Sequence, residues 1–330
     1  MNPRVRPILF LVIACIITSP AFTQKINPYQ YSIQKKVECS NGAVVSAHPL
    51  ASQVGLSILK QGGNAIDAAI ATQLALAVVY PGAGNIGGGG FMVARLQNGQ
   101  TVALDYREKA PGQATRDMYL NEKGDAVTEK SQNGHLSAGV PGTIAGLFAS
   151  MKYAKLPFAK LIQPAIDLAE KGFVITQAEA RSLNGLQDEL KKYNTVTPVF
   201  VKEAGWKAGD TLVQKDLANT LKRIRDKGQK GFYEGKTAEL IVAEMQRGNG
   251  IITLKDLQQY QARWRKPLEF TYRGHKIITM PAPSSGGIII AQMLKMIETE
   301  PMKQYGFHSL QSVQLMIEVE RRAYADRAKH

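Results

Sequence analysis

Six glycines within nine residues make the segment 82–90 the first candidate for chemistry in this sequence. Gly82, Gly84 and Gly87 reproduce the G-x-G-x-x-G spacing of turns that hold the phosphates of a dinucleotide. Such a turn follows a strand and opens a helix, because the free amides at the start of the helix face the phosphates. The elements on either side of the glycines therefore decide whether a nucleotide could bind there.

The flanking elements occur in the opposite order. Residues 65–79 (AIDAAIATQLALAVV) are apolar nearly all round, which predicts a buried helix that ends at Pro81. The segment from Phe91 onward alternates and turns at Asn98-Gly99, which predicts a two-stranded hairpin. The helix end beside the glycines is then a C-terminus, whose partial negative charge repels phosphate. The order argues against a nucleotide site, and we expect the glycines to permit close backbone contact and positive φ.

A second turn has the order that an anion site requires. In PAPSSGG, a predicted strand leads through Ser284 and Ser285 into a helix that begins near Ile288. The first amides of that helix could hold an anion. The simpler interpretation is a serine that caps the helix by accepting a hydrogen bond from its first turn.

An arginine stands at the end of a predicted strand. Arg107 lies in ALDYREKAP, with Asp105 and Glu108 close by in the sequence. Its planar guanidinium can bind a carboxylate through two parallel hydrogen bonds, which lysine cannot do. From the residues alone, a surface arginine paired with Asp105 is the simpler interpretation.

The histidines provide no support for a metal site. They show no metal-ligand spacing with one another or with Cys39, and neither H-E-x-x-H nor G-x-S-x-G occurs; their positions are 48, 135, 275, 308 and 330. We therefore expect neither a metal nor a cofactor.

The composition is that of an ordinary globular protein. The chain has 330 residues, of which 44% are hydrophobic and 21% charged, and we expect one continuous domain. Its formal net charge is +14, but the basic residues are spread along the chain, and the densest run, at 221–236, is interrupted by acidic residues and glycines. Without a basic stripe that carries stacking aromatics, we expect no nucleic-acid partner.

The N-terminus resembles an export signal. Arg4 and Arg6 precede the apolar run 8–17, which is too short to span a bilayer, and Ala21 and Thr23 fit a cleavage site. We therefore predict a signal peptide at residues 1–23, a periplasmic or secreted mature protein, and no stable membrane span.

Whether the mature protein keeps both of its cysteines depends on the signal-peptide prediction. The residues around Cys15 also resemble a lipoprotein box, although the apolar run continues beyond it. If the signal is removed, Cys39 is left alone and no internal disulfide can form.

Two further segments suggest elements with buried faces. GAVVSAHP, at 42–49, looks like a short buried strand. Near the other end, Leu310, Val313, Ile317 and Tyr324 recur at helical spacing and predict an amphipathic helix.

Taken in order, several motifs resemble the large subunit of the γ-glutamyltranspeptidases. They are the stretch from GGNAIDAAI through the glycines to DYREKAP, then HLSAGVPGTIAGL, MPAPSSGGIIIAQML and ERRAYADR. The resemblance covers residues 24–330 and implies an N-terminal-nucleophile hydrolase αββα sandwich, a mixed α/β (α+β) fold. It also implies a precursor, a zymogen, that cleaves itself into a large and a small subunit.

The resemblance assigns a reaction and one residue. Glutathione and other γ-glutamyl compounds would be the donors, and water, amino acids or peptides the acceptors. A threonine freed by the self-cleavage would be the nucleophile. Arg107 matches the arginine of the family's D-[FY]-R-E motif, which grips the donor's α-carboxylate.

The family's nucleophile motif, a threonine run followed by histidine and a hydroxyl residue, is not found in the chain. We expect it beyond His330, with the remaining substrate contacts and the oxyanion hole. The sandwich would then be incomplete and the chain inactive by itself, because the small subunit of the same precursor is absent. A related glutaryl or cephalosporin acylase, and a catalytically inactive fragment, stay open as alternatives.

Overall fold

The computed structural model describes residues 38–329. The predicted signal peptide at 1–23 and Cys15 lie outside the described residues, so both stay predictions. Within the described part, no helix is both long and apolar enough to cross a membrane.

A helix pair forms the centre of the larger unit, which we call the body. α1 (Pro49–Lys60) packs against α2 (Ala65–Val79), and α2 also packs against α5 (Phe158–Lys171). The Asn64 side chain caps α2 by accepting from two backbone amides, while Asp67 accepts from the Asn64 amide. Leu74 and Val78 are completely buried, so the prediction of a buried helix at these residues is confirmed.

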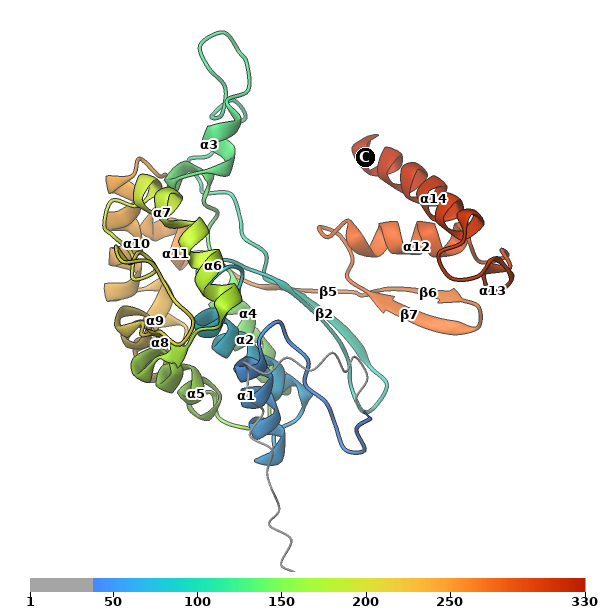
Figure 1. Cartoon of the computed structure of the whole chain (residues 1–330), viewed down its shortest axis with the longest axis horizontal. Helices are drawn as coiled ribbons and strands as arrows, with labels where there is room; N and C mark the ends of the chain where they lie inside the picture. Colours follow the sequence, from blue (N-terminus) through green and yellow to red (C-terminus); the bar gives the residue numbers. More distant parts are fainter. Residues whose placement is uncertain (1–37, 330) are drawn as a thin grey trace, which may run out of the picture.

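Further helices surround this pair in the body (Figure 1). α5 packs against α8 (Lys215–Lys227), and α8 contacts α9 (Lys230–Tyr233). The other elements are short or peripheral: α3 (Thr128–Gln132), η1 (His135–Ser137), α4 (Thr143–Ser150), η2 (Met151–Tyr153), α6 (Gln177–Gly185), α7 (Gln187–Tyr193), α10 (Gly235–Arg247), α11 (Leu254–Gln258), and the paired strands β3 (Phe173–Val174) and β4 (Thr211–Leu212).

A three-stranded antiparallel sheet carries the D-Y-R-E motif. β1 (Phe91–Arg95) and β2 (Thr101–Asp105) form the predicted hairpin, and β5 (Arg263–Arg265) pairs with the other edge of β2. Asp105 lies opposite Arg263 in the register, so β5 brings distant basic residues beside the motif.

The remaining elements form a second unit, which we call the C-terminal unit (residues 268–329). It contains the hairpin of β6 (Leu268–Tyr272) and β7 (His275–Thr279), followed by α12 (Gly286–Met296), α13 (Met302–Tyr305) and α14 (Leu310–Lys329). α12 packs against α14 and β6. Figure 1 shows this unit beside the body, joined to it through β5 and β6, with the N-terminus of α12 and the C-terminal end of α14 directed toward the body.

Two of the predicted buried faces are not covered. Residues 42–48 form no strand, and Val45 is 92% exposed. α14 is a helix as predicted, but Leu310 and Ile317 are 78% and 52% exposed. In both segments the apolar pattern is present, but the described residues cover only part of it: Val44 is half-buried, and Val319 and Ala323 are buried.

Candidate functional site

The glycine segment packs directly against the backbone of the D-Y-R-E motif. The Gly90 amide donates to the Tyr106 carbonyl over 3.2 Å, and the Tyr106 amide donates back over 3.0 Å. A Cβ atom placed on Gly89 would lie 2.5 Å from the Tyr106 carbonyl oxygen and 2.9 Å from Cα of Arg107. Only a residue without a side chain allows this approach.

The other side of the segment is fixed to the start of α4. The amides of Gly142 and Thr143 donate to the Gly88 carbonyl at 2.7 and 3.0 Å. Asn85 Oδ1 accepts from the Gly88 amide and from the Thr143 hydroxyl, both at 2.9 Å. The expected close approach is thereby confirmed. The expected positive φ is wrong, because no glycine of the segment 82–90 adopts it. Close packing requires a glycine at four positions of the segment, Gly84, Gly88, Gly89 and Gly90.

Hydrogen bonds hold the backbone of Arg107 at both its amide and its carbonyl group. Its amide donates to Asp105 Oδ1 over 3.1 Å, and its carbonyl accepts from the Tyr260 hydroxyl over 2.7 Å. Burial, with the negative charges of Asp105 and Glu108, raises the pKa of Tyr260 above its usual range. The Tyr260 hydroxyl therefore keeps its proton and remains a donor to Arg107.

The predicted partner of Arg107 is occupied by another arginine. Asp105 Oδ2 accepts from Arg265 Nε at 2.8 Å and from its terminal nitrogen at 2.6 Å, and the Asp105 side chain is only 10% exposed. The interpretation of Arg107 as a surface arginine paired with Asp105 is thus wrong. Its guanidinium is exposed and has no hydrogen bond or ion pair with any described residue.

A hollow of about 700 Å³ opens in front of Arg107, which we call the arginine hollow. Arg107 lines it from the body. The C-terminal unit provides the rest of the lining, chiefly Ser284, Ser285, Gln292, Asp326 and Arg327.

The serines at the start of α12 do not cap it. Ser285 already has helical backbone angles, φ −73° and ψ −21°, and its side chain makes no capping hydrogen bond. Its hydroxyl instead accepts from Arg327 Nε over 3.0 Å. The N-cap interpretation is therefore wrong for Ser285, because Arg327 from α14 takes the hydroxyl.

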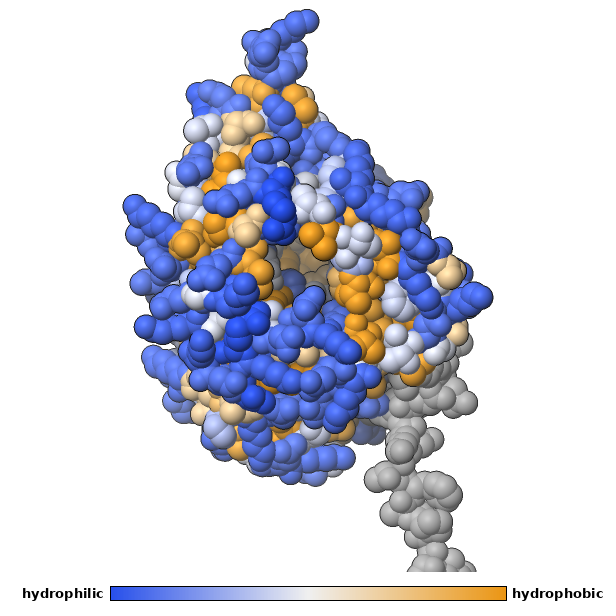
Figure 2. All heavy atoms as spheres, turned by 90° about the vertical axis from the view of Figure 1, so that its left-hand side faces the viewer, coloured by the Kyte–Doolittle hydropathy of each residue, from blue (hydrophilic) through white to orange (hydrophobic). Residues whose placement is uncertain are grey.

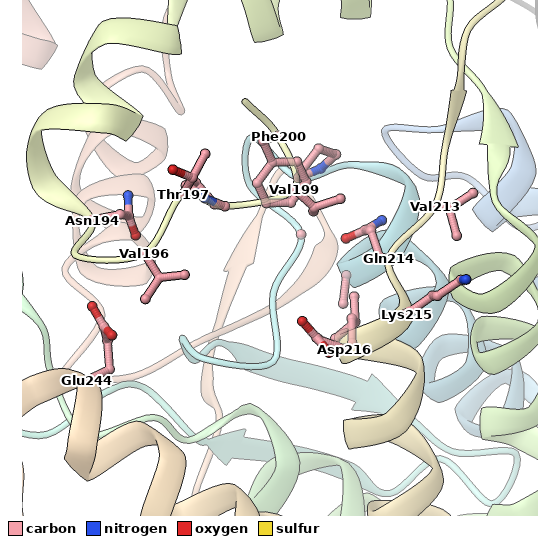
Figure 3. A pocket seen from close by; sticks show the side chains of 15 residues that line it. Asn194, Val196, Thr197, Val199, Phe200, Val213, Gln214, Lys215, Asp216 and Glu244 are labelled. Atoms are coloured by element: carbon pink, nitrogen blue, oxygen red, sulfur yellow. The ribbon is translucent and has the colours of Figure 1, made fainter. Parts of the chain in front are cut away.

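A second pocket, of about 730 Å³, lies in the body (Figure 3). The face of the body in Figure 2 is largely hydrophilic and is hollowed near its centre. Two polar side chains of the second pocket have structural partners: Gln214 donates to the Val78 carbonyl over 2.7 Å, and Glu244 accepts from Thr195 and Arg247. The pocket's one lining cation, Lys215, stands among Asp216 and Glu244, whereas two arginines and one aspartate line the arginine hollow, which is therefore the better candidate for binding an anion.

Two histidines are bound to carboxylates. His48 Nε2 lies 2.8 Å from Glu179, and His135 Nε2 lies 2.8 Å from Glu244. Partial burial raises the pKa of Glu244, but hydrogen bonds from His135, Thr195 and Arg247 outweigh it and lower that pKa to about 2. Across residues 38–329, no group of three His, Cys, Asp or Glu side chains is placed to hold a metal ion.

Comparisons with known proteins show the family of the chain. The family model of the γ-glutamyltranspeptidases matches residues 51–330. The chain is 46% identical over 310 residues to the glutathione hydrolase proenzyme of Escherichia coli K12, covering 92% of this chain and 53% of that protein. It is 37% identical over 303 residues to the acylase ACY 1 proenzyme of Pseudomonas sp. V22, covering 89% and 54%. The chain thus spans about half the length of the curated relatives it matches.

A solved structure supports the fold. The γ-glutamyltranspeptidase of Helicobacter pylori superposes with a TM-score of 0.86 at 47% identity, covering 89% of this chain and 85% of that one. The predicted fold class is confirmed by this match.

Proposed function

The chain belongs to the γ-glutamyltranspeptidase family, and on that premise we propose that it provides the large-subunit part of an enzyme that transfers and hydrolyses γ-glutamyl groups. The proposed donors are glutathione and other γ-glutamyl compounds. The observation that carries the proposal is the unpaired Arg107 guanidinium on the wall of the arginine hollow.

Arg107 suits the α-carboxylate of a γ-glutamyl donor. A guanidinium binds a carboxylate best through two parallel hydrogen bonds, and this one is not occupied by a described residue. The hydrogen bonds to Asp105 and Tyr260 fix the backbone from which the side chain extends. When Arg107 binds the α-carboxylate of a donor, the glutamyl side chain limits how far the γ-amide can lie from Arg107. Binding therefore helps to position the γ-amide bond for attack.

The remaining chemistry is proposed to come from the small subunit of the same precursor. Self-cleavage would free a threonine whose hydroxyl attacks the γ-amide carbonyl, while its own α-amine takes the hydroxyl proton. Hydrogen bonds from N–H groups of the oxyanion hole stabilise the negative charge on the carbonyl oxygen. The proton passes to the leaving amine, and a γ-glutamyl ester of the threonine remains. Water or an acceptor amine then takes the γ-glutamyl group. On this proposal the 330-residue chain has no activity by itself.

Export is a separate part of the proposal. We propose that residues 1–23 are removed and that the mature protein is periplasmic or secreted, with lipidation at Cys15 as the alternative. The mass of the mature large subunit distinguishes the two, because lipidation at Cys15 leaves residues 15–23 and an acyl group on the chain.

The test of the main proposal is Arg107→Lys in the full-length precursor. Lysine keeps the positive charge but cannot form the two parallel hydrogen bonds of a guanidinium. KM for the γ-glutamyl donor is therefore expected to rise about tenfold or more, while self-cleavage is normal. Arg95→Lys is the matched control, because Arg95 is also exposed but lies on β1 and does not line the hollow. An unchanged KM in a normally cleaved Arg107→Lys enzyme would overturn the assignment.

The acylase alternative rests on the 37% identity to an acylase proenzyme. A glutaryl donor has a terminal carboxylate but no α-amino group. Two donors with the same leaving group, one γ-glutamyl and one glutaryl, separate the functions. The proposal predicts a clear preference for the γ-glutamyl donor, and a preference for the glutaryl donor favours the acylase.

A further inference from the structure

The arginine hollow is lined by a second cation, Arg327, on the part of its wall that the C-terminal unit provides. Arg327 extends from the C-terminal end of α14, and its Nε donates to Ser285 Oγ over 3.0 Å. Its guanidinium carbon lies 5.9 Å from the centre of the Tyr324 ring, and its terminal nitrogens have no hydrogen bond or ion pair with any described residue. One edge of the guanidinium is thus fixed, and the other is available to a ligand.

The neighbouring arginines of α14 are in a different state. Arg321 and Arg322 both bind the Glu318 carboxylate, at 3.0 and 2.8 Å, as ordinary ion pairs on a helix surface. Arg327 is bound across two helices, to the start of α12. That contact turns Arg327 toward the hollow, which neither of the other two arginines lines.

The charges around the hollow favour an anion with two negative ends. Arg107 and Arg327 are its basic side chains and Asp326 its acidic one. Asp326 is engaged, because its Oδ2 accepts from Gln292 over 2.8 Å. The hollow of about 700 Å³ lies within the range of roughly 300–1,000 Å³ typical of small-molecule sites.

We propose that Arg327, held by Ser285, is a second carboxylate-binding position in the arginine hollow. The substrate class it selects is a γ-glutamyl peptide whose leaving group ends in a carboxylate of its own. Arg107 binds the α-carboxylate of the glutamyl end, and Arg327 binds the carboxylate of the departing end. This inference rests on the proposed function of Arg107.

A structural role for Arg327 is the competing explanation. A cation at the C-terminal end of a helix stabilises that helix without any ligand. Such a role would affect all donors alike, whereas a carboxylate site acts only on donors that carry the second carboxylate.

The experiment uses the full-length precursor and two donors that differ at one group: γ-glutamylcysteinylglycine and the same peptide with its C-terminal carboxylate converted to an amide. The wild-type enzyme is expected to prefer the free acid about tenfold in kcat/KM, the size of one charged hydrogen-bonded contact. Arg327→Gln is expected to remove this preference and to change kcat/KM for the amide less than about twofold.

Three variants complete the test. Arg321→Gln, on the same helix but paired with Glu318, is expected to keep the wild-type preference. Ser285→Ala removes only the group that orients Arg327 and is expected to reduce the preference in part, and it decides the matter if Arg327→Gln fails to cleave itself. Arg107→Gln is expected to lower kcat/KM for both donors equally, so its outcome judges the proposed function separately.

A wild-type enzyme without the preference, or an Arg327→Gln enzyme that keeps it, would overturn the inference. Equal losses for both donors in Arg327→Gln would assign Arg327 the structural role instead.

Discussion

α2 and α14 are both helices with strong apolar patterns, but their surroundings differ. In α2, Leu74 and Val78 have no exposed surface, and the element packs against α1, α4 and α5. In α14, only Ser312, Val319 and Ala323 are buried, against α12 and α13, while Leu310, Val313, Ile317 and Tyr324 are exposed. The apolar surface of α2 is covered within the body, and most of the apolar face of α14 is left open in the C-terminal unit.

The contrast extends to the two walls of the arginine hollow. On the body wall, the backbone of Arg107 is fixed by two hydrogen bonds and by the glycine segment. On the other wall, the Arg327 side chain has one hydrogen bond, to Ser285, and lies over the ring of Tyr324, which is itself exposed. We therefore expect the body wall to be rigid and the other wall to depend on whatever covers α14, which we propose to be the small subunit.

The largest difference is expected between two core truncations. Leu74→Ala should lower the free energy of unfolding by about 3 kcal/mol, because it opens a cavity in a closed core. Ile317→Ala should lower it by only about 0.5 kcal/mol in the 330-residue chain, because this side chain is half exposed there. Urea titration measures both. In the full-length precursor, the cost of Ile317→Ala should rise toward that of Leu74→Ala, and an unchanged small cost would contradict a cover over α14.

The glycine segment offers a sharper test of the body wall. Gly89→Ala should lower the free energy of unfolding by about 2 kcal/mol, because the new Cβ would overlap the Tyr106 carbonyl oxygen. Gly87→Ala is the matched control, because a Cβ there meets nothing within 4 Å and its φ is not positive. Thermal unfolding of the two variants, compared with the parent, should show a loss only for Gly89→Ala. Equal losses would mean that packing is not the reason for the glycines.

The smallest effect concerns the pH dependence of the body. The folded-state pKa of Glu244 is about 2, below its ordinary value of 4.5, so its contribution to stability is present above pH 4.5 and is lost as pH falls toward 2. Glu244→Gln should therefore make the stability less dependent on pH in that window. Urea midpoints at pH 3 and pH 7 measure it, and an identical pH dependence in parent and variant would count against this role.

Local patterns predicted the elements well where the sequence carries its own signal. The capped helix at 65–79 and the turn at Asn98-Gly99 depend on neighbouring residues, and both were found where the sequence places them. The segment 42–48, in which Val45 is exposed, shows the limit, because an apolar pattern indicates a face to be covered but not whether a cover is present.

The site depended on contacts that no local pattern contains. Arg265 is 160 residues from Asp105 in the sequence, and Arg327 is 42 residues from Ser285. Because each of these arginines takes the group that sequence reasoning assigned to a nearer partner, Arg107 was expected to be paired and Ser285 was expected to cap a helix. The family resemblance identified Arg107, but only the structure shows that its guanidinium is unpaired among residues 38–329.

The central claim, that Arg107 binds the α-carboxylate of the γ-glutamyl group, is tested most directly by a crystal structure of the mature two-subunit protein with L-glutamate bound. We predict that both carboxylate oxygens of the α-carboxyl group lie about 2.8 Å from nitrogens of the Arg107 guanidinium. A glutamate whose α-carboxylate is bound elsewhere, with Arg107 making no contact to it, would contradict the account.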